Sequence, residues 1–134
     1  MFKLKKISLV VLTLFYLIAG INHFRDAQSY FKIIPHYIYH PDVLNLLAGS
    51  CEILFAVMLI FSKTRQLALR GIILMLLAFL PVHISMISKA PLQLGIITVT
   101  PLLAWIRLLI LQPLLILWAL WHVKYHRSGL KANH

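Results

Sequence analysis

Acidic residues are scarce in this sequence: it has three among 134 residues, against 13 lysines and arginines. Charged residues of both signs make up 12% of the chain, whereas soluble domains contain roughly 25%. So few charges exclude the surface of an ordinary soluble domain. Hydrophobic residues instead make up 61% of the chain, and this composition is typical of a membrane protein.

Cysteine is almost absent, because Cys51 is the only one. A single cysteine excludes an internal disulfide and a C-x-x-C thiol site. Thiol exchange would therefore need a cysteine from another protein. We interpret Cys51 as a small packing residue within a helix.

Long apolar runs fill most of the chain, and each is close to the roughly 20 helical residues that cross a bilayer. The basic N-terminus resembles a signal peptide, but it lacks an A-x-A cleavage site, so we expect the first run to be retained. The sequence predicts an all-α fold, an antiparallel four-helix transmembrane bundle forming a single domain over residues 1–134. The predicted spans are 7–24, 43–61, 67–88 and 102–123, and the outer segments are 25–41 and 89–100.

The basic residues outside the spans or close to their ends are distributed unevenly. Three lie in the outer segments: Arg25, Lys32 and Lys89. Nine lie at the other ends of the spans: Lys3, Lys5, Lys6, Lys63, Arg65, Arg70, Lys124, Arg127 and Lys131. The positive-inside rule then places both termini in the cytoplasm (N-in, C-in). We attribute the positive charge to this topology and to anionic lipid headgroups, and we expect no nucleic-acid partner.

The two outer segments have different compositions. Residues 25–41 contain several tyrosines, including Tyr30, which are favoured at the membrane–water boundary, and a short helical stretch is expected before Pro35. Residues 89–100 lie between two prolines and contain Gly95 and β-branched residues, which favour an extended surface loop. Trp118, Trp121 and Tyr125 are expected to form the inner aromatic belt.

Polar and small residues recur at helical spacing within three of the spans, so each set lies on one helix face. We expect the three faces to meet inside the bundle, because small residues allow helices to approach closely in a membrane. The three sets are Thr13, Tyr16, Gly20 and His23; Asn45, Gly49, Glu52 and Ala56; and Ala104, Arg107, Leu111, Leu114 and Trp118.

Two of these residues carry charges inside the apolar runs. Glu52 lies about ten residues into its span, or about 15 Å deep, and Arg107 lies near the outer side of its span. An unpaired charge in hydrocarbon costs at least about 2.5 kcal/mol. We therefore expect Glu52 and Arg107 to form a pair, with His23 as a third member of the cluster.

Three interpretations of this cluster remain open. It could be structural, holding the helices in register. It could be a polar pocket in the outer leaflet that binds a quinone headgroup or another small ligand, with Glu52 and His23 exchanging protons with it. A metal site from His23, Glu52 and His83 is a third alternative, but no helix carries a ligand pair at i, i+4, so we assign no metal.

Two further polar residues, His83 and Gln112, are possible members of the site. His83 points away from the small-residue face formed by Ala78, Val82 and Ser85 in the third span, so we expect it to meet lipid headgroups, with the site as the alternative. Gln112 precedes Pro113, which should kink the fourth span and free a carbonyl. We expect Gln112 to bond to that carbonyl.

The order of polar residues resembles the DoxX-like family of small membrane proteins. The resemblance rests on residues 19–24 (Ala-Gly-Ile-Asn-His-Phe), Ile34-Pro35, residues 48–54 (Ala-Gly-Ser-Cys-Glu-Ile-Leu), and Arg107, Gln112 and Trp118. It implies a four-helix protein of the bacterial inner membrane. Some DoxX-like proteins are subunits of a thiosulfate:quinone oxidoreductase, and others are linked to membrane redox complexes.

These observations lead to three functional hypotheses. The first is a DoxX-like accessory subunit of a membrane redox complex, which binds a quinone or lipid-like ligand, has no covalently bound cofactor and is not catalytic alone. Its partners would be the lipid bilayer, a membrane redox protein and further copies of the chain. The second is a non-catalytic assembly or scaffold protein, and the third is a small oligomeric transporter.

Overall fold

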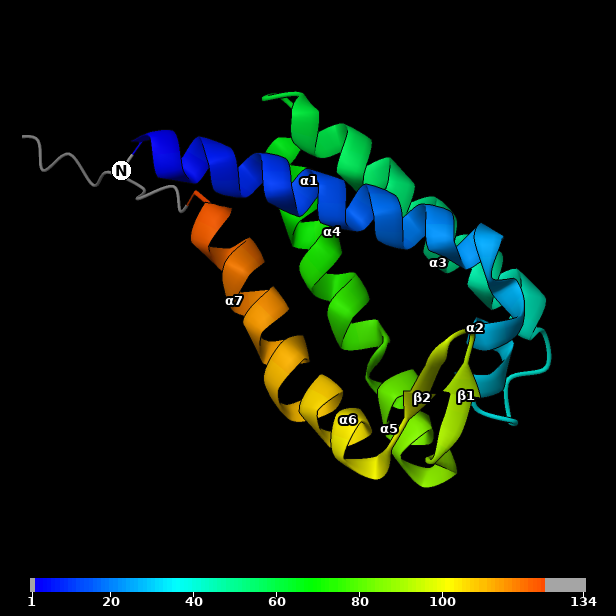
Figure 1. Ribbon diagram of the computed structural model, residues 1–134. Helices are drawn as coiled ribbons and strands as arrows, with labels where there is room; N and C mark the ends of the chain where they lie inside the picture. Colours follow the sequence, from blue (N-terminus) through cyan, green and yellow to red (C-terminus); the bar gives the residue numbers. More distant parts are fainter. Residues whose placement is uncertain (1, 125–134) are drawn as a thin grey trace, which may run out of the picture.

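The computed structural model describes residues 2–124, and most of them are helical (Figure 1). Four stretches are long and apolar enough to cross a membrane: Phe2–Arg25, Pro41–Ile60, Arg65–Lys89 and Pro101–His122. The elements are α1 (Phe2–Arg25), α2 (Ala27–Ile33), α3 (Pro41–Ile60), α4 (Arg65–Ala78), α5 (Leu80–Lys89), β1 (Leu92–Leu94), β2 (Ile97–Val99), α6 (Pro101–Ile106), the π-helical segment η1 (Arg107–Leu111) and α7 (Gln112–His122).

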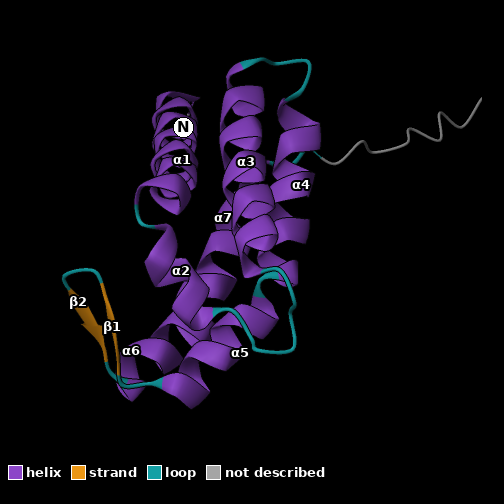
Figure 2. Ribbon diagram, turned by 90° about the vertical axis from the view of Figure 1, so that its right-hand side faces the viewer, coloured by secondary structure: helices purple, strands orange, loops and turns teal. Residues whose placement is uncertain are grey.

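The short helix expected before Pro35 is present as α2. It ends where Ile34 adopts an extended conformation (φ −70°, ψ 133°), because a following proline disfavours the helical region. The segment expected as an extended loop is instead a hairpin, in which Leu92 pairs with Val99 and Leu94 with Ile97. Gly95 at its turn has φ +58°, a conformation that glycine adopts without strain. Figure 2 shows the hairpin at the same end of the molecule as α2, α5 and α6.

The third apolar run is two helices rather than one. The break lies at Phe79, between α4 and α5, and Pro81 occupies the first turn of α5, where its missing N–H is tolerated. The buried face nevertheless continues across the break, because Ile72, Leu76, His83 and Met86 are buried at helical spacing. Ala78, on the face predicted to be internal, is exposed. The prediction for His83 is wrong because the small-residue face is not the buried one.

The helical phase shifts in the fourth run, where η1 lies just before Pro113. A π-helical turn contains an extra residue and displaces every later residue around the helix. The buried residues of α7 are Gln112, Leu115, Ala119 and His122. The predicted residues Leu111 and Leu114 are instead 44% and 54% exposed. Downstream of Arg107 the predicted face is wrong by one position.

Helices α1 and α3 pack closely, and Figure 1 shows them side by side. A methyl group added to Gly20 would lie 2.9 Å from the carbonyl oxygen of Gly49, and one added to Gly49 would lie 2.7 Å from Cβ of His23. The two glycines therefore permit a crossing that larger residues would prevent. Thr13, predicted on this face, donates to the Leu9 carbonyl of its own helix, and Leu12 is buried beside Tyr16.

The start of α1 lies beside the end of α7. His122 bonds to Ser8 Oγ (3.1 Å), Trp118 Nε1 donates to the same oxygen (2.8 Å), and Gln66 Nε2 donates to the His122 carbonyl (3.3 Å). These contacts bring α1, α4 and α7 together at the end opposite α2 and the hairpin (Figure 1). The predictions for Tyr125, Arg127 and Lys131 lie outside the described residues.

Candidate functional site

A cavity of about 340 Å³ lies among α1, α2, α3, α5 and η1, and its lining is mostly apolar. Its size is typical of small-molecule sites. Most of the residues predicted as a polar cluster line it: Tyr16, His23, Asn45, Glu52, His83 and Arg107. Gly49 and Gln112 do not line it. Gly49 packs against His23, and Gln112 bonds to Arg107.

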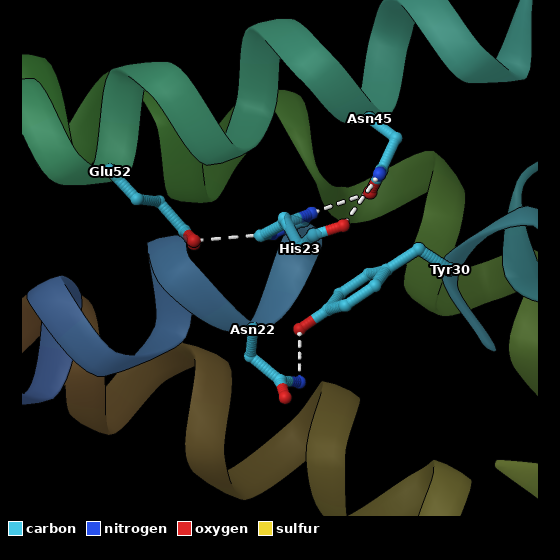
Figure 3. Close-up of polar contacts among 5 residues, drawn as sticks. All are labelled: Asn22, His23, Tyr30, Asn45 and Glu52. Carbon is cyan, nitrogen blue, oxygen red and sulfur yellow. Dashed lines mark hydrogen bonds and ion pairs between the residues drawn. The ribbon is translucent and has the colours of Figure 1, made fainter. Parts of the chain in front are cut away.

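His23 is held by two residues of α3, as Figure 3 shows. Its Nδ1 lies 2.7 Å from Asn45 Oδ1, and Asn45 Nδ2 donates to the His23 carbonyl at 2.8 Å. Because a carbonyl can only accept, the second bond fixes the orientation of the Asn45 amide. Asn45 Oδ1 therefore accepts from Nδ1, and Nδ1 carries a hydrogen.

The other nitrogen of His23, Nε2, lies 3.1 Å from Glu52 Oε2. Since Nδ1 already carries a hydrogen, the ring and the carboxyl group can share one further proton at this distance. That proton is either on Nε2, giving imidazolium and carboxylate, or on Glu52, giving two neutral groups. Both side chains are buried, with His23 7% and Glu52 6% exposed. The arrangement can hold or release one proton at the cavity wall.

Tyr30 of α2 covers this pair. Its ring stacks on the His23 ring, with centroids 3.8 Å apart, and its hydroxyl accepts from Asn22 Nδ2 at 3.0 Å. Burial raises the pKa of the Tyr30 phenol, so the hydroxyl stays protonated at neutral pH. From the sequence, Tyr30 was expected only at the membrane–water boundary. Helical spacing orders residues within one helix, so it could not place a residue of the separate helix α2 against His23 of α1.

Helix α2 is fixed over the cavity by lysine contacts. Lys89 Nζ donates to the carbonyls of Lys32 and Ile34, at 2.9 Å each. Lys32 Nζ in turn donates to the Gln93 carbonyl of the hairpin at 3.1 Å. An ammonium at the end of a helix also complements its dipole. Lys89 and Lys32, expected only as outer charges, therefore tie α2 to α5 and β1.

Arg107 does not form the expected pair with Glu52. Its Nη1 donates to Gln112 Oε1 at 2.9 Å, and Gln112 Nε2 donates to the Leu76 carbonyl of α4. Gln112 therefore bonds to a neighbouring helix and not to a carbonyl freed by Pro113. The cause is η1, which sets the positions of Arg107 and Gln112 on the helix. Across residues 2–124 the acid–base pair is His23–Glu52.

His83 is buried in the cavity wall, with 7% of its surface exposed. The expectation that it meets lipid headgroups is therefore wrong. Neither of its ring nitrogens has a hydrogen-bond partner among residues 2–124, and the same is true of Tyr16 Oη. Buried polar atoms are rarely left without partners. These three atoms, and Glu52 Oε2, which makes no hydrogen bond beside its contact with His23, could bind a polar ligand in the cavity.

Within the described part of the chain, no three His, Cys, Asp or Glu side chains are placed to share a metal ion. His23 and Glu52 contact each other, and His83 has no contact to either that would complete a ligand set.

Comparison with known proteins places the chain in one family. The family model described as a domain of unknown function, DUF8561, matches residues 12–123, so the chain belongs to this family. No curated protein and no solved structure matches the chain.

Proposed function

We propose that this member of the DUF8561 family is an integral membrane protein that binds the headgroup of a quinone or another lipid-like molecule in the cavity. The observation that carries the proposal is the group of buried polar atoms without partners, on Tyr16 and His83, within an apolar wall. Apolar pockets with a few convergent polar groups are typical ligand sites. A structural role alone would leave these atoms unsatisfied.

The proposed topology is an antiparallel four-helix bundle in the bacterial inner membrane, with both termini in the cytoplasm. The uneven basic residues support this orientation, as does the contact of Ser8 with His122, which brings the start of α1 to the end of α7. The cavity would then lie in the outer leaflet. Exposed apolar side chains on the long helices, such as Ile18, Leu74 and Leu109, would face lipid.

The proposed role is that of an accessory subunit for a redox partner, as the DoxX-like resemblance implies. The described residues supply a binding place and a proton, through the His23–Glu52 pair, and the chain has one cysteine for any thiol chemistry. Electrons would come from the partner. The chain would position the headgroup and exchange one proton with it.

Binding of decylubiquinone to the full chain in nanodiscs tests the proposal, with empty nanodiscs as the blank. Wild type should bind it saturably, and Glu52→Gln should bind it about tenfold more weakly, because a hydrogen bond to a charged group contributes roughly 1.5 kcal/mol or more. Asp42→Asn is the matched control, since Asp42 is exposed and outside the cavity.

Native mass spectrometry of gently purified protein would identify any co-purified ligand by its mass. Absence of saturable decylubiquinone binding, together with absence of a lipid-like adduct, would contradict the proposal and favour a scaffold role.

A further inference from the structure

The cavity contains one charge that the protein does not balance. The whole chain has three acidic side chains, Asp26, Asp42 and Glu52, and of these only Glu52 lines the cavity. Glu52 is already paired with His23. Arg107 contacts the neutral amide of Gln112 instead of a carboxylate.

The net charge of the cavity wall does not depend on where the shared proton lies. If it is on His23, the imidazolium and the carboxylate cancel; if it is on Glu52, both groups are neutral. While the pair holds this proton, the guanidinium of Arg107, which does not lose its proton in proteins, leaves a net charge of +1. Release of the proton would leave the Glu52 carboxylate to offset this charge. Arg107 is partly buried, and a charge removed from water without a counter-charge is unfavourable in an apolar environment.

The groups beside this charge can also bind an anion. Only Nη1 of Arg107 has a hydrogen-bond partner in the part of the chain that the structure covers, so the other guanidinium nitrogens can donate to a ligand. The Tyr16 hydroxyl and the His83 ring, both without partners, line the same cavity. Each supplies a donor, and N–H and O–H donors around a cation are suited to a carboxylate or phosphate oxygen.

We propose that the ligand of this cavity is a singly anionic amphiphile, whose acidic oxygen headgroup is bound by Arg107, Tyr16 and His83 while its alkyl chain contacts the apolar wall. This inference rests on the proposed function in using the same cavity, and it assigns the ligand's charge. Two sources share the chemistry: the carboxylate of a fatty acid and the phosphodiester of an anionic phospholipid.

The test compares headgroups on one alkyl chain. Radiolabelled dodecanoate is titrated at pH 8 onto the full chain in phosphatidylcholine nanodiscs, with empty nanodiscs subtracting partition into the bilayer. Unlabelled dodecanol and decylubiquinone serve as neutral competitors, and nanodiscs enriched in phosphatidylglycerol supply the phosphodiester. We expect saturable dodecanoate binding, with dodecanol at least about tenfold weaker as a competitor, the difference expected for a charge-assisted hydrogen bond.

Three variants assign the effect to Arg107. Arg107→Gln should weaken dodecanoate binding about tenfold or more, whereas Arg107→Lys should retain most of it. Gln112→Glu places a carboxylate beside Arg107, although it loses the bond to the Leu76 carbonyl, and should weaken dodecanoate binding. Arg70→Gln is the control, since Arg70 is exposed and outside the cavity. Thermal unfolding of each variant verifies that it is folded.

The outcomes separate the two proposals. Competition by phosphatidylglycerol, or binding of it in place of dodecanoate, supports the anionic ligand and identifies its source. Equal affinity for dodecanol and dodecanoate in wild type, or binding of decylubiquinone alone, overturns the anionic ligand but retains the proposed function. Absence of binding by every probe overturns both. The wild-type comparison decides the question even where a variant does not fold.

Discussion

His23 and Glu52 form the acid–base pair of residues 2–124, with Nε2 and Oε2 3.1 Å apart. The reason lies in the crossing of α1 and α3, where Gly20 and Gly49 bring the two backbones together. At this separation an imidazole on α1 reaches a carboxylate on α3. Arg107 lies on η1, which contacts α5, and it bonds to Gln112 instead.

Replacing Gly20 by alanine should destabilise the protein. The added methyl group would lie 2.9 Å from both Gly49 O and Ile53 N, and because these are backbone atoms the helices must separate. Overpacking of this kind costs roughly 1–3 kcal/mol. Thermal unfolding in detergent measures the change. Gly71→Ala is the matched control, because its methyl group meets the end of the Phe55 ring, which can rotate. An equal effect at both glycines would contradict the close crossing.

Asn45→Ala should release His23. The change removes the acceptor for Nδ1 and the donor to the His23 carbonyl, and each buried group left without a partner costs about 1–3 kcal/mol. Both the unfolding temperature and ligand affinity should fall. Ser50→Ala, at an exposed position on the same helix, is the control. If Asn45→Ala kept the stability of the wild type, Asn45 would not hold the ring.

The π-helical segment η1 predicts which residues of α7 face lipid. In a Cys51→Ala background, a lipid-soluble maleimide should label Leu114→Cys rapidly, because Leu114 is 54% exposed. Leu115→Cys, at a buried position, should react at least several-fold more slowly. A regular α-helix through Arg107 would give the reverse order, so the ratio of the two labelling rates tests the extra residue directly.

Tyr30 should make the stability of the protein fall as the pH rises above 10. Burial raises the pKa of its phenol above the ordinary value of 10.0, so the folded protein holds this proton more tightly than the unfolded chain. The stabilisation is complete below pH 10 and is lost as the pH rises from 10 through the folded pKa. The unfolding temperature of wild type should therefore fall more steeply above pH 10 than that of Tyr30→Phe. Parallel curves would show that the phenol is not buried.

The sequence by itself determined the four long helices, because the length of an apolar run and its lack of charge depend on composition alone. It also determined the faces of α1 and α3 that carry Tyr16, His23, Asn45 and Glu52, since both helices are regular there and spacing orders their side chains. The same reasoning failed after Arg107, where the π-helical turn before Pro113 changes the phase of the helix. In the third span it failed because the small residues do not mark the buried face, which runs through Leu76 and His83.

Only the tertiary structure decided which charges meet. Spacing within one helix cannot measure the distance between two, so the sequence placed Glu52 beside Arg107 when the glycine crossing places it beside His23. The position of α2, and with it the stacking of Tyr30 on His23, depends on long-range bonds from Lys89 to the end of that helix. The scarcity of acidic residues was visible from the start, but only the folded chain shows that it leaves Arg107 without a carboxylate partner.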